Sequence, residues 1–250
     1  MPFFSSLPTV DPQSVVDGAK LWSGPGYIDG LQMQWVSATA VTVSSGRAYI
    51  PSLGYYLDAP NAISLTGLAL AASTFYHLYL YNNAGTPALE CVTTAPAAPY
   101  SGTARAKTGD TSRRYIGSVL TDASANIYNF THLTLAGSIR YLTSIFAAPF
   151  QVVNGTASVP TSVSCAGVIP VTGKNAALSY ANNDTVVTVL LGNSISPPNN
   201  SAIAFLSQLG KVSTLDGEIP VDGSQAFQYT FVVAPTSNFI ARVRGYYYER

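Results

Sequence analysis

Charged side chains are scarce in this sequence of 250 residues. Asp, Glu, Lys and Arg make up 10% of the chain, and twelve acids balance twelve bases, whereas about a quarter of an average soluble protein is charged. The bases are scattered, and the closest pair, Arg113 and Arg114, would point to opposite faces of a strand. Because no basic patch is present, we expect no nucleic-acid partner.

Histidine and cysteine are rare too, with two residues of each. Neither His77 nor His132 is flanked by a nucleophile motif such as Gly-x-Ser-x-Gly, and two histidines with two distant cysteines lack the spacing of a zinc site. We interpret Cys91 and Cys165 as buried free thiols and His77 as a packing residue inside a strand. No catalytic residue is predicted, and the chain is expected not to be an enzyme.

Long apolar runs are missing as well. None approaches the roughly 18 residues that a membrane-spanning helix needs, and residues 1–4 lack the basic region that opens a secretion signal. These observations predict a chain that is made in a cytoplasm and does not insert in a membrane. Val, Ile, Leu, Phe and Tyr are nevertheless abundant, so the composition is that of a folded protein and not of a disordered one.

Short β-strand patterns separated by turn residues fill most of the sequence. A run of β-formers at 75–81 ends at Asn82-Asn83-Ala84-Gly85, whose Asn and Gly accept positive φ. Further strands are predicted at 87–93, 113–121 and 127–130, and the four are expected to form an antiparallel meander.

The second half of the sequence gives two further strand signals. Asn154-Gly155 between two β-branched runs predicts a hairpin. The closing strand is predicted at 239–248. Strict alternation along it would put one set of side chains on a common face, namely Ile240, Arg242, Arg244, Tyr246 and Tyr248.

These patterns predict two all-β units behind a short helical arm. Asp11-Pro12 favours the start of an amphipathic helix, which Gly24-Pro25-Gly26 would end. Residues 1–25 are therefore predicted as an arm that either packs on its own chain or anchors it to a neighbouring protein. Residues 26–145 and 146–250 are predicted as two antiparallel β-sandwich or jelly-roll-like domains, since turns recur every 8 to 12 residues in the first of them.

Tyrosine is over-represented, with 16 residues. A buried tyrosine needs a partner for its hydroxyl, so this number exceeds what a core requires. Some are predicted to lie at a subunit interface or to contact a glycan, because the ring offers a flat apolar face and a polar tip. The candidates are Tyr55, Tyr56, Tyr79, Tyr81, Tyr246, Tyr247 and Tyr248.

Asp216, Glu218 and Asp222 form the main cluster of carboxylates, in the segment TLDGEIPVDG. Asp-Gly occurs twice in it, so the simplest interpretation is a hairpin with acids in its turns. A calcium site is the second interpretation, because Ca²⁺ prefers oxygen ligands. An acid pair for glycoside hydrolysis is the third. No other cofactor is predicted.

Residues 26–130 resemble a module of tailed-bacteriophage tail-fibre and related virion proteins. The resemblance is carried by Asn-Ala-Gly-Thr-Pro-Ala at 83–88, by Thr-Thr-Ala-Pro at 93–96 and by the segment GTARAKTGDTSRRYIGSV at 102–119. The upstream segments 28–31 and 46–54 fit it too. Ala125 follows Asp-Ala-Ser at a point where this module favours glycine. The last 105 or so residues carry no such resemblance.

The resemblance implies a virion structural protein of the tail-fibre or receptor-binding type, assembled in a bacterial cytoplasm as a homotrimer. It would join other virion proteins through its N-terminal arm and contact a host-surface glycan through its second domain. The alternative is a capsid decoration protein, a head fibre, or a tail or baseplate component without receptor contact. A glycan-degrading enzyme of the tailspike kind is a third possibility, which needs a carboxylate pair in one cleft. The low charge favours assembly, because neutral surfaces repel one another weakly.

Overall fold

The described structure consists of β-strands and their connecting loops. It is a computed structural model that describes residues 24–133, 137–146, 148–199, 202–206 and 213–250. All strand pairings in these ranges are antiparallel, and the ranges contain no helix. The prediction of an all-β, antiparallel chain is thus confirmed, whereas the predicted helical arm lies almost entirely outside the described residues. Nothing in the described ranges is a helix that could cross a membrane.

The first half of the chain forms three small sheets with the strand orders β1-β4-β5, β2-β3-β6 and β8-β7-β10-β9. The strands are β1 (Ile28–Gly30), β2 (Met33–Ser37), β3 (Ala40–Val43), β4 (Gly46–Ile50), β5 (Tyr55–Ala59), β6 (Ile63–Leu65), β7 (Phe75–Asn83), β8 (Thr86–Val92), β9 (Ala106–Lys107) and β10 (Asp110–Leu120).

The second half forms two sheets with the orders β11-β12-β20-β15-β18, to which β13 adds by pairing with β20, and β14-β19-β16-β17. The strands are β11 (Phe130–Leu133), β12 (Ser138–Tyr141), β13 (Gln151–Gly155), β14 (Thr161–Ser164), β15 (Gly173–Asn182), β16 (Val189–Gly192), β17 (Ala204–Leu206), β18 (Ser213–Pro220), β19 (Ala226–Phe231) and β20 (Phe239–Tyr248).

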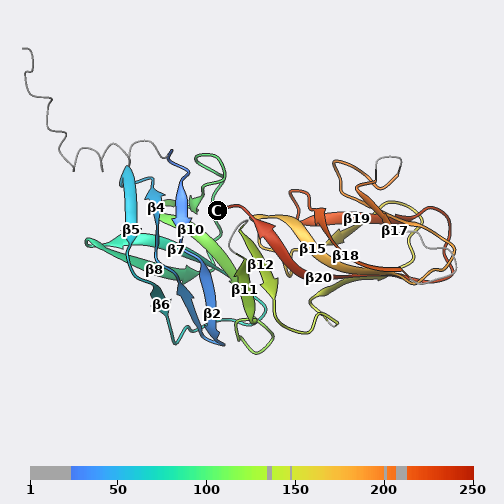
Figure 1. Cartoon of the computed structure of the whole chain (residues 1–250), viewed down its shortest axis with the longest axis horizontal. Coiled ribbons are helices and arrows are strands. Elements are labelled where there is room, and N and C mark those ends of the chain that lie inside the picture. Colours follow the sequence, from blue (N-terminus) through green and yellow to red (C-terminus); the bar gives the residue numbers. More distant parts are fainter. Residues whose placement is uncertain (1–23, 134–136, 147, 200–201, 207–212) are drawn as a thin grey trace, which may run out of the picture.

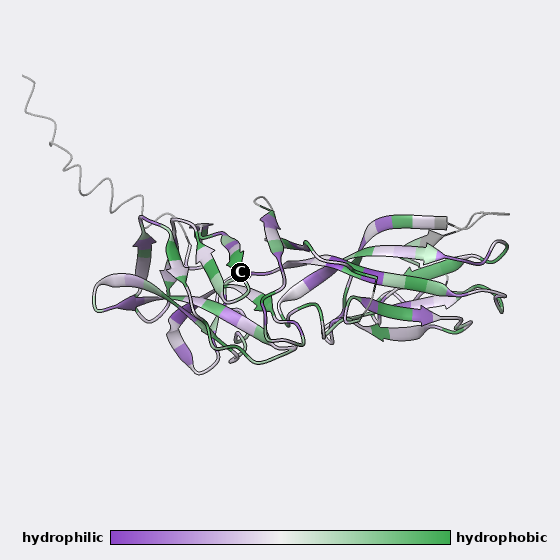
Figure 2. Ribbon diagram, turned by 90° about the horizontal axis from the view of Figure 1, so that it is seen from below, coloured by the Kyte–Doolittle hydropathy of each residue, from purple (hydrophilic) through white to green (hydrophobic). Residues whose placement is uncertain are grey.

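The molecule is elongated. Strands β1–β10 lie towards one end, the sheet of β14, β19, β16 and β17 lies towards the other, and the C-terminus lies between them (Figure 1). Figure 2 shows that the strands at the end opposite β1–β10 run along the long axis, whereas β11 and β12, near the middle, run across it (Figure 1). The two sheets of that half share a core, in which the Tyr229 ring of one sheet stacks on Phe239 of the other with centroids 5.1 Å apart.

The predicted meander is wrong in its pairing. β10 pairs with β7 instead of β8, and Phe130 begins a strand of another sheet. The physical reason is burial. β7 and β10 hold long runs of buried side chains, whereas β8 is half-exposed over most of its length. Placing β7 and β10 side by side, with β8 at the edge, buries the most apolar surface.

The predicted Asn154-Gly155 hairpin is also wrong. Both residues lie inside β13 and pair with β20, while the next strand, β14, belongs to the other sheet. Gly155 is required there by a close approach, because a Cβ at this position would collide with the hydroxyl of Tyr229. The glycine thus serves packing between the two sheets and does not serve a turn.

β20 has the predicted bounds but not the predicted faces. Its pairing with β15 shifts between Ala177, opposite Gly245, and Leu178, opposite Val243. Arg244 is the extra residue of this β-bulge, and a bulge reverses the alternation beyond it. Val243 is buried before the bulge and Tyr246 is buried after it.

β20 also joins the two halves. β11 and β12, which lie within the range predicted for the first domain, are hydrogen-bonded through β12 to β20. Beyond the bulge, the Tyr248 hydroxyl donates to the Ile116 carbonyl of β10 at 3.0 Å. The Arg250 guanidinium donates to the Leu31 carbonyl at 2.9 Å. A strand of one half is therefore anchored in the other.

A buried polar network lies at this junction. The Tyr115 hydroxyl, on β10, lies 2.8 Å from the Thr172 hydroxyl of the second half and 2.8 Å from the Ser118 hydroxyl. Ser118 is in turn 2.7 Å from Nδ1 of His77. Because unpaired polar groups are costly in an interior, this network favours a single arrangement of the two halves.

Candidate functional site

Three of the tyrosines predicted to meet a ligand or a subunit are core residues instead. Tyr79, Tyr246 and Tyr248 are buried. Their hydroxyls donate to backbone carbonyls, Tyr79 to Thr94 at 2.7 Å and Tyr246 to Ser118 at 3.1 Å, as Tyr248 does to β10. Because each ring is buried and each hydroxyl has a hydrogen-bond partner within the chain, these three tyrosines do not form the predicted contact surface.

The other four predicted tyrosines are accessible but dispersed. Tyr55 and Tyr56 lie on β5, and the Tyr56 hydroxyl donates to the Gly24 carbonyl. Tyr81 lies on β7 under the Arg113 guanidinium, which stacks 3.8 Å from the ring centroid. Tyr247 lies on β20. The structure therefore does not bring the predicted aromatics together into one binding surface.

The predicted acids also separate. Asp216 and Glu218 lie on β18, where Asp216 pairs with Arg244, and Glu218 lies 3.6 Å from Arg140 and accepts a hydrogen bond from the Tyr247 hydroxyl. They line a shallow depression of about 160 Å³ that Asp222 does not reach. The Asp216-Gly217 turn is thus wrong, because both residues are inside a strand.

Asp222 lies in a turn, as predicted. Its carboxylate accepts hydrogen bonds from the backbone N–H groups of Ser224 and Ala226, at 2.9 and 3.1 Å. In the described part of the chain, no three His, Cys, Asp or Glu side chains gather as a metal site would require. The structure therefore does not bring the three predicted acids together as calcium ligands: arginines pair with Asp216 and Glu218, and turn N–H groups engage Asp222.

The histidines are enclosed and uncharged. Burial lowers the pKa of His77 to about 4, and burial together with the charge of Arg250 lowers that of His132 to about 4. Nδ1 of His132 accepts a hydrogen bond from the Met33 N–H at 3.0 Å. Both side chains therefore act in the interior, which agrees with the packing role predicted for His77.

The cysteines are free thiols, as predicted, although Cys91 is only half-buried. Burial raises the pKa of Cys91 and of Cys165 to about 12. A thiol with so high a pKa stays protonated at neutral pH and is a poor nucleophile.

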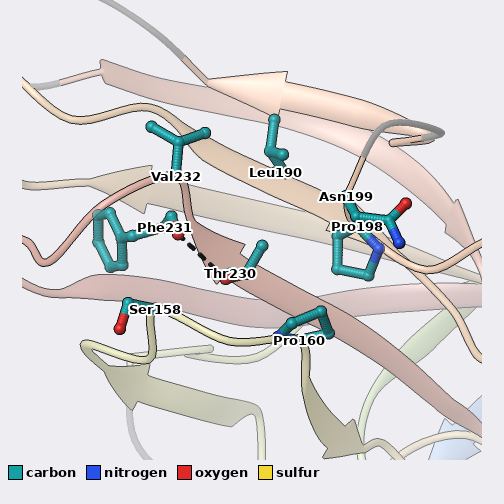
Figure 3. A pocket seen from close by; sticks show the side chains of 8 residues that line it. All are labelled: Ser158, Pro160, Leu190, Pro198, Asn199, Thr230, Phe231 and Val232. Carbon is teal, nitrogen blue, oxygen red and sulfur yellow. Dashed lines mark hydrogen bonds between the residues drawn. The ribbon is translucent and has the colours of Figure 1, made fainter.

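The sequence does not predict the hollow on the outer face of the sheet formed by β14, β19, β16 and β17. This depression measures about 340 Å³. Figure 3 shows side chains of β16, β19 and three loops around it, and the Thr230 hydroxyl bonded to its own strand at the Phe231 carbonyl, 3.1 Å away. The lining comprises Ser158, Pro160, Leu190, Pro198, Asn199, Thr230, Phe231 and Val232.

The sheet of β14, β19, β16 and β17 exposes branched apolar side chains, and the described carboxylates beside it, Asp184 and Asp222, accept hydrogen bonds within the chain. β14, β16, β17 and β19 contain no Asp, Glu, Lys or Arg. The exposed residues on these strands and their loops are Val159, Val186, Ile195, Ile203, Val232 and Val233. Ile195 is separate from the others, because it follows β16 at the end where Gly192 pairs with Gln228, whereas Val232 follows β19 at the opposite end, where Val189 pairs with Phe231. We call the exposed apolar residues other than Ile195, together with the depression, the distal face.

A sequence signal for the distal face existed in part. The run 185–191 has apolar residues on both faces and predicts a central, buried strand, but the strand begins only at Val189, and Val186 is 63% exposed. The absence of charge from 185 to 210 is visible in the sequence. Which of these side chains point outward depends on the pairing with β19.

Comparison with protein-family models and with curated proteins gives no match to this chain. The functional argument therefore depends on the chain's own surfaces.

Proposed function

We propose that this chain is a non-enzymatic structural protein of a tailed-bacteriophage virion, of the tail-fibre type, which assembles with copies of itself and mediates attachment to the host surface. The virion assignment is supported by the resemblance of residues 26–130. The distal face supports assembly and is the single observation that carries it. In this proposal, the two halves are sandwich-like modules, and residues 1–25 anchor the chain to the particle.

The distal face favours association for two physical reasons. Removing exposed Val and Ile side chains from water is favourable by about 25 cal/mol for each Å² of apolar area. The strands of this face contain no charged residue, so burying them carries no cost of an unpaired charge and they do not repel an identical copy. Exposed apolar side chains grouped in this way are typical of protein–protein contact sites.

The mass in solution tests assembly. Light scattering on the wild-type chain is expected to give three times 26.3 kDa. Val232→Asp should shift the mass toward 26.3 kDa, because it buries a carboxylate in the contact. Val36→Asp is the matched control, since Val36 and Val232 are both 52% exposed and Val36 lies in the first half. A wild-type monomer at micromolar concentration would refute assembly through this face.

Immunogold electron microscopy of phage particles with an antibody to this chain tests its location. Gold at the tail end is the expected result. Gold over the capsid would replace the tail-fibre proposal by a decoration or head-fibre role, in which the distal face is a contact between subunits. Unlabelled particles would refute the virion assignment.

A further inference from the structure

A second hollow lies at the junction of the two halves, between β2 and β11. Each of these strands is an edge strand of its own sheet. The two edges approach closely enough for the backbone N–H of Met33 to reach the ring of His132. The hollow measures about 380 Å³ and is called here the junction groove.

The junction groove is rich in uncommitted polar side chains. Gln32 and Gln34 come from the β2 side, and Asn129 and Thr131 from the β11 side. Gln34 is exposed and the other three are half-buried. Within the described residues, none of the four side chains makes a hydrogen bond to another residue. A carboxamide offers both donors and acceptors, so the groove presents paired hydrogen-bonding capacity to a ligand.

The groove also has a rigid apolar element. The indole Nε1–H of Trp35 donates to the Ile127 carbonyl at 3.1 Å, and the ring packs against the core, which fixes its orientation. Leu142 adds an apolar side chain that is 56% exposed. Fixed aromatic surface lowers the entropic cost of binding a ligand.

Among the described residues, no charged side chain lines the groove. Its one titratable side chain, His132, is neutral at physiological pH, because burial and the charge of Arg250 lower its pKa to about 4. Arg250 itself is outside the lining, and its guanidinium is bonded to the Leu31 and Gly30 carbonyls. The electrostatics thus favour a ligand without net charge, since an ion would lose its hydration without gaining a counter-charge.

We propose that the junction groove binds an uncharged oligosaccharide, with the Gln, Asn and Thr side chains bonding its hydroxyl groups and Trp35 and Leu142 contacting its C–H surface. The inference rests on the proposed attachment function and names the class of ligand. A sugar ring combines an apolar face with a hydroxyl-rich edge, as the groove does. An added peptide strand fits less well, because the Met33–His132 hydrogen bond already joins the two edges that it would have to separate.

Tryptophan fluorescence of the full chain tests the proposal. Trp22 and Trp35 are the two tryptophans, so a Trp22→Phe background leaves Trp35 as the only reporter. The probes are chitotetraose, maltotetraose and mannotetraose as neutral sugars, tetragalacturonate as an anionic sugar, and an Ala-Ser hexapeptide. A saturable change with at least one neutral sugar is expected. Gln34→Ala and Asn129→Ala should each weaken binding about fivefold, as the loss of one hydrogen bond implies.

Asn61→Ala is the matched control, because Asn61 is exposed and lies outside the groove. It should leave the affinity unchanged. No response to any neutral sugar, a response to the hexapeptide alone, or wild-type affinity in both groove variants would overturn the inference. A chain that forms trimers but binds no neutral sugar would overturn the groove assignment and leave the assembly proposal standing. A sugar-binding monomer would do the reverse.

Discussion

Replacing Tyr115 by Phe would remove one oxygen atom from the junction between the two halves. The hydroxyl is fully enclosed and lies 2.8 Å from both Ser118 and Thr172. The ring would keep its edge contact with Tyr248, whose centroid is 6.2 Å away. The substitution therefore tests the hydrogen bonds of the junction with little change in packing.

The expected cost follows from the partners left behind. Among the described residues, the Thr172 hydroxyl has only Tyr115 as a side-chain partner, whereas Ser118 keeps His77. A buried polar group without a partner costs about 1–3 kcal/mol. For a chain of this size, each kcal/mol lowers the melting temperature by about 2–4 °C, so we expect Tyr115→Phe to lower it by roughly 4–8 °C for a cost near the middle of that range.

Calorimetry with a double-mutant cycle is the assay. Thr172→Val removes the other partner, and Tyr115→Phe/Thr172→Val should be less destabilised than the sum of the single variants by about 0.5–3 kcal/mol. Tyr55→Phe is the control, because Tyr55 is 49% exposed, and its effect should stay within about 0.5 kcal/mol. The proposed role of these hydrogen bonds is refuted if Tyr115→Phe lowers the free energy of unfolding no more than Tyr55→Phe does. It is also refuted if the losses caused by Tyr115→Phe and Thr172→Val are additive in the double variant.

Three further predictions concern pH and packing. His77 and His132 have pKa values lowered from 6.5 to about 4 by burial, with Arg250 adding to the effect on His132, so only the unfolded chain gains these protons between the two values. Stability should fall as the pH falls through that window, and a melting temperature unchanged between about pH 7 and about pH 4.5 would contradict this. The pKa of Asp184 is lowered by hydrogen bonds from the backbone N–H groups of Val186, Thr236 and Val187, so its carboxylate stabilises the fold above the unfolded value of about 3.9 and less as the pH falls below it. Asp184→Asn should therefore flatten the decline in melting temperature below about pH 4, and a slope equal to that of the wild type would count against the assignment. Gly245→Ala should cost about 1–3 kcal/mol, because its Cβ would collide with the Ile139 carbonyl, while Gly223→Ala, with open space around it, should be neutral in the same urea melts.

Some local signals in the sequence hold in the structure, although Asn154-Gly155 and Asp216-Gly217 lie in strands and not in the predicted turns. The predicted turn at 82–85 forms, with Asn82 accepting the Gly85 N–H at 2.7 Å. Gly85 has the expected positive φ, but Ala84 takes the second positive φ that the sequence predicts for an asparagine. The turn after Asp122 forms too, although Ala125 takes a positive φ of 64° without being glycine. The Asp122 carboxylate accepts hydrogen bonds from the backbone N–H groups of Ser124 and Asn126, at 2.8 and 2.9 Å, so this turn depends on residues within four positions of one another.

Local sequence signals do not predict the junction groove or the distal face. Alternation at 31–35 predicts a strand with one polar face, yet the strand that completes the groove lies about 100 residues further along the chain. The tyrosines of β20 show the same limit, because a single bulge at Arg244 transfers Tyr246 and Tyr248 to the buried face. No property of the residues 239–248 by themselves specifies where that bulge falls.

By itself the sequence determines the all-β character of this chain, the positions of many of its turns and strands, and the scarcity of charge at its distal end. These depend on the φ and ψ preferences of single residues and on alternation over a few positions. The tertiary structure alone decides that β10 pairs with β7, that β20 ties the two halves together, and that the Gln, Asn and Thr side chains of β2 and β11 share one groove. Those outcomes depend on which distant strands bury the most apolar surface together, and residues far apart in the sequence fix that jointly.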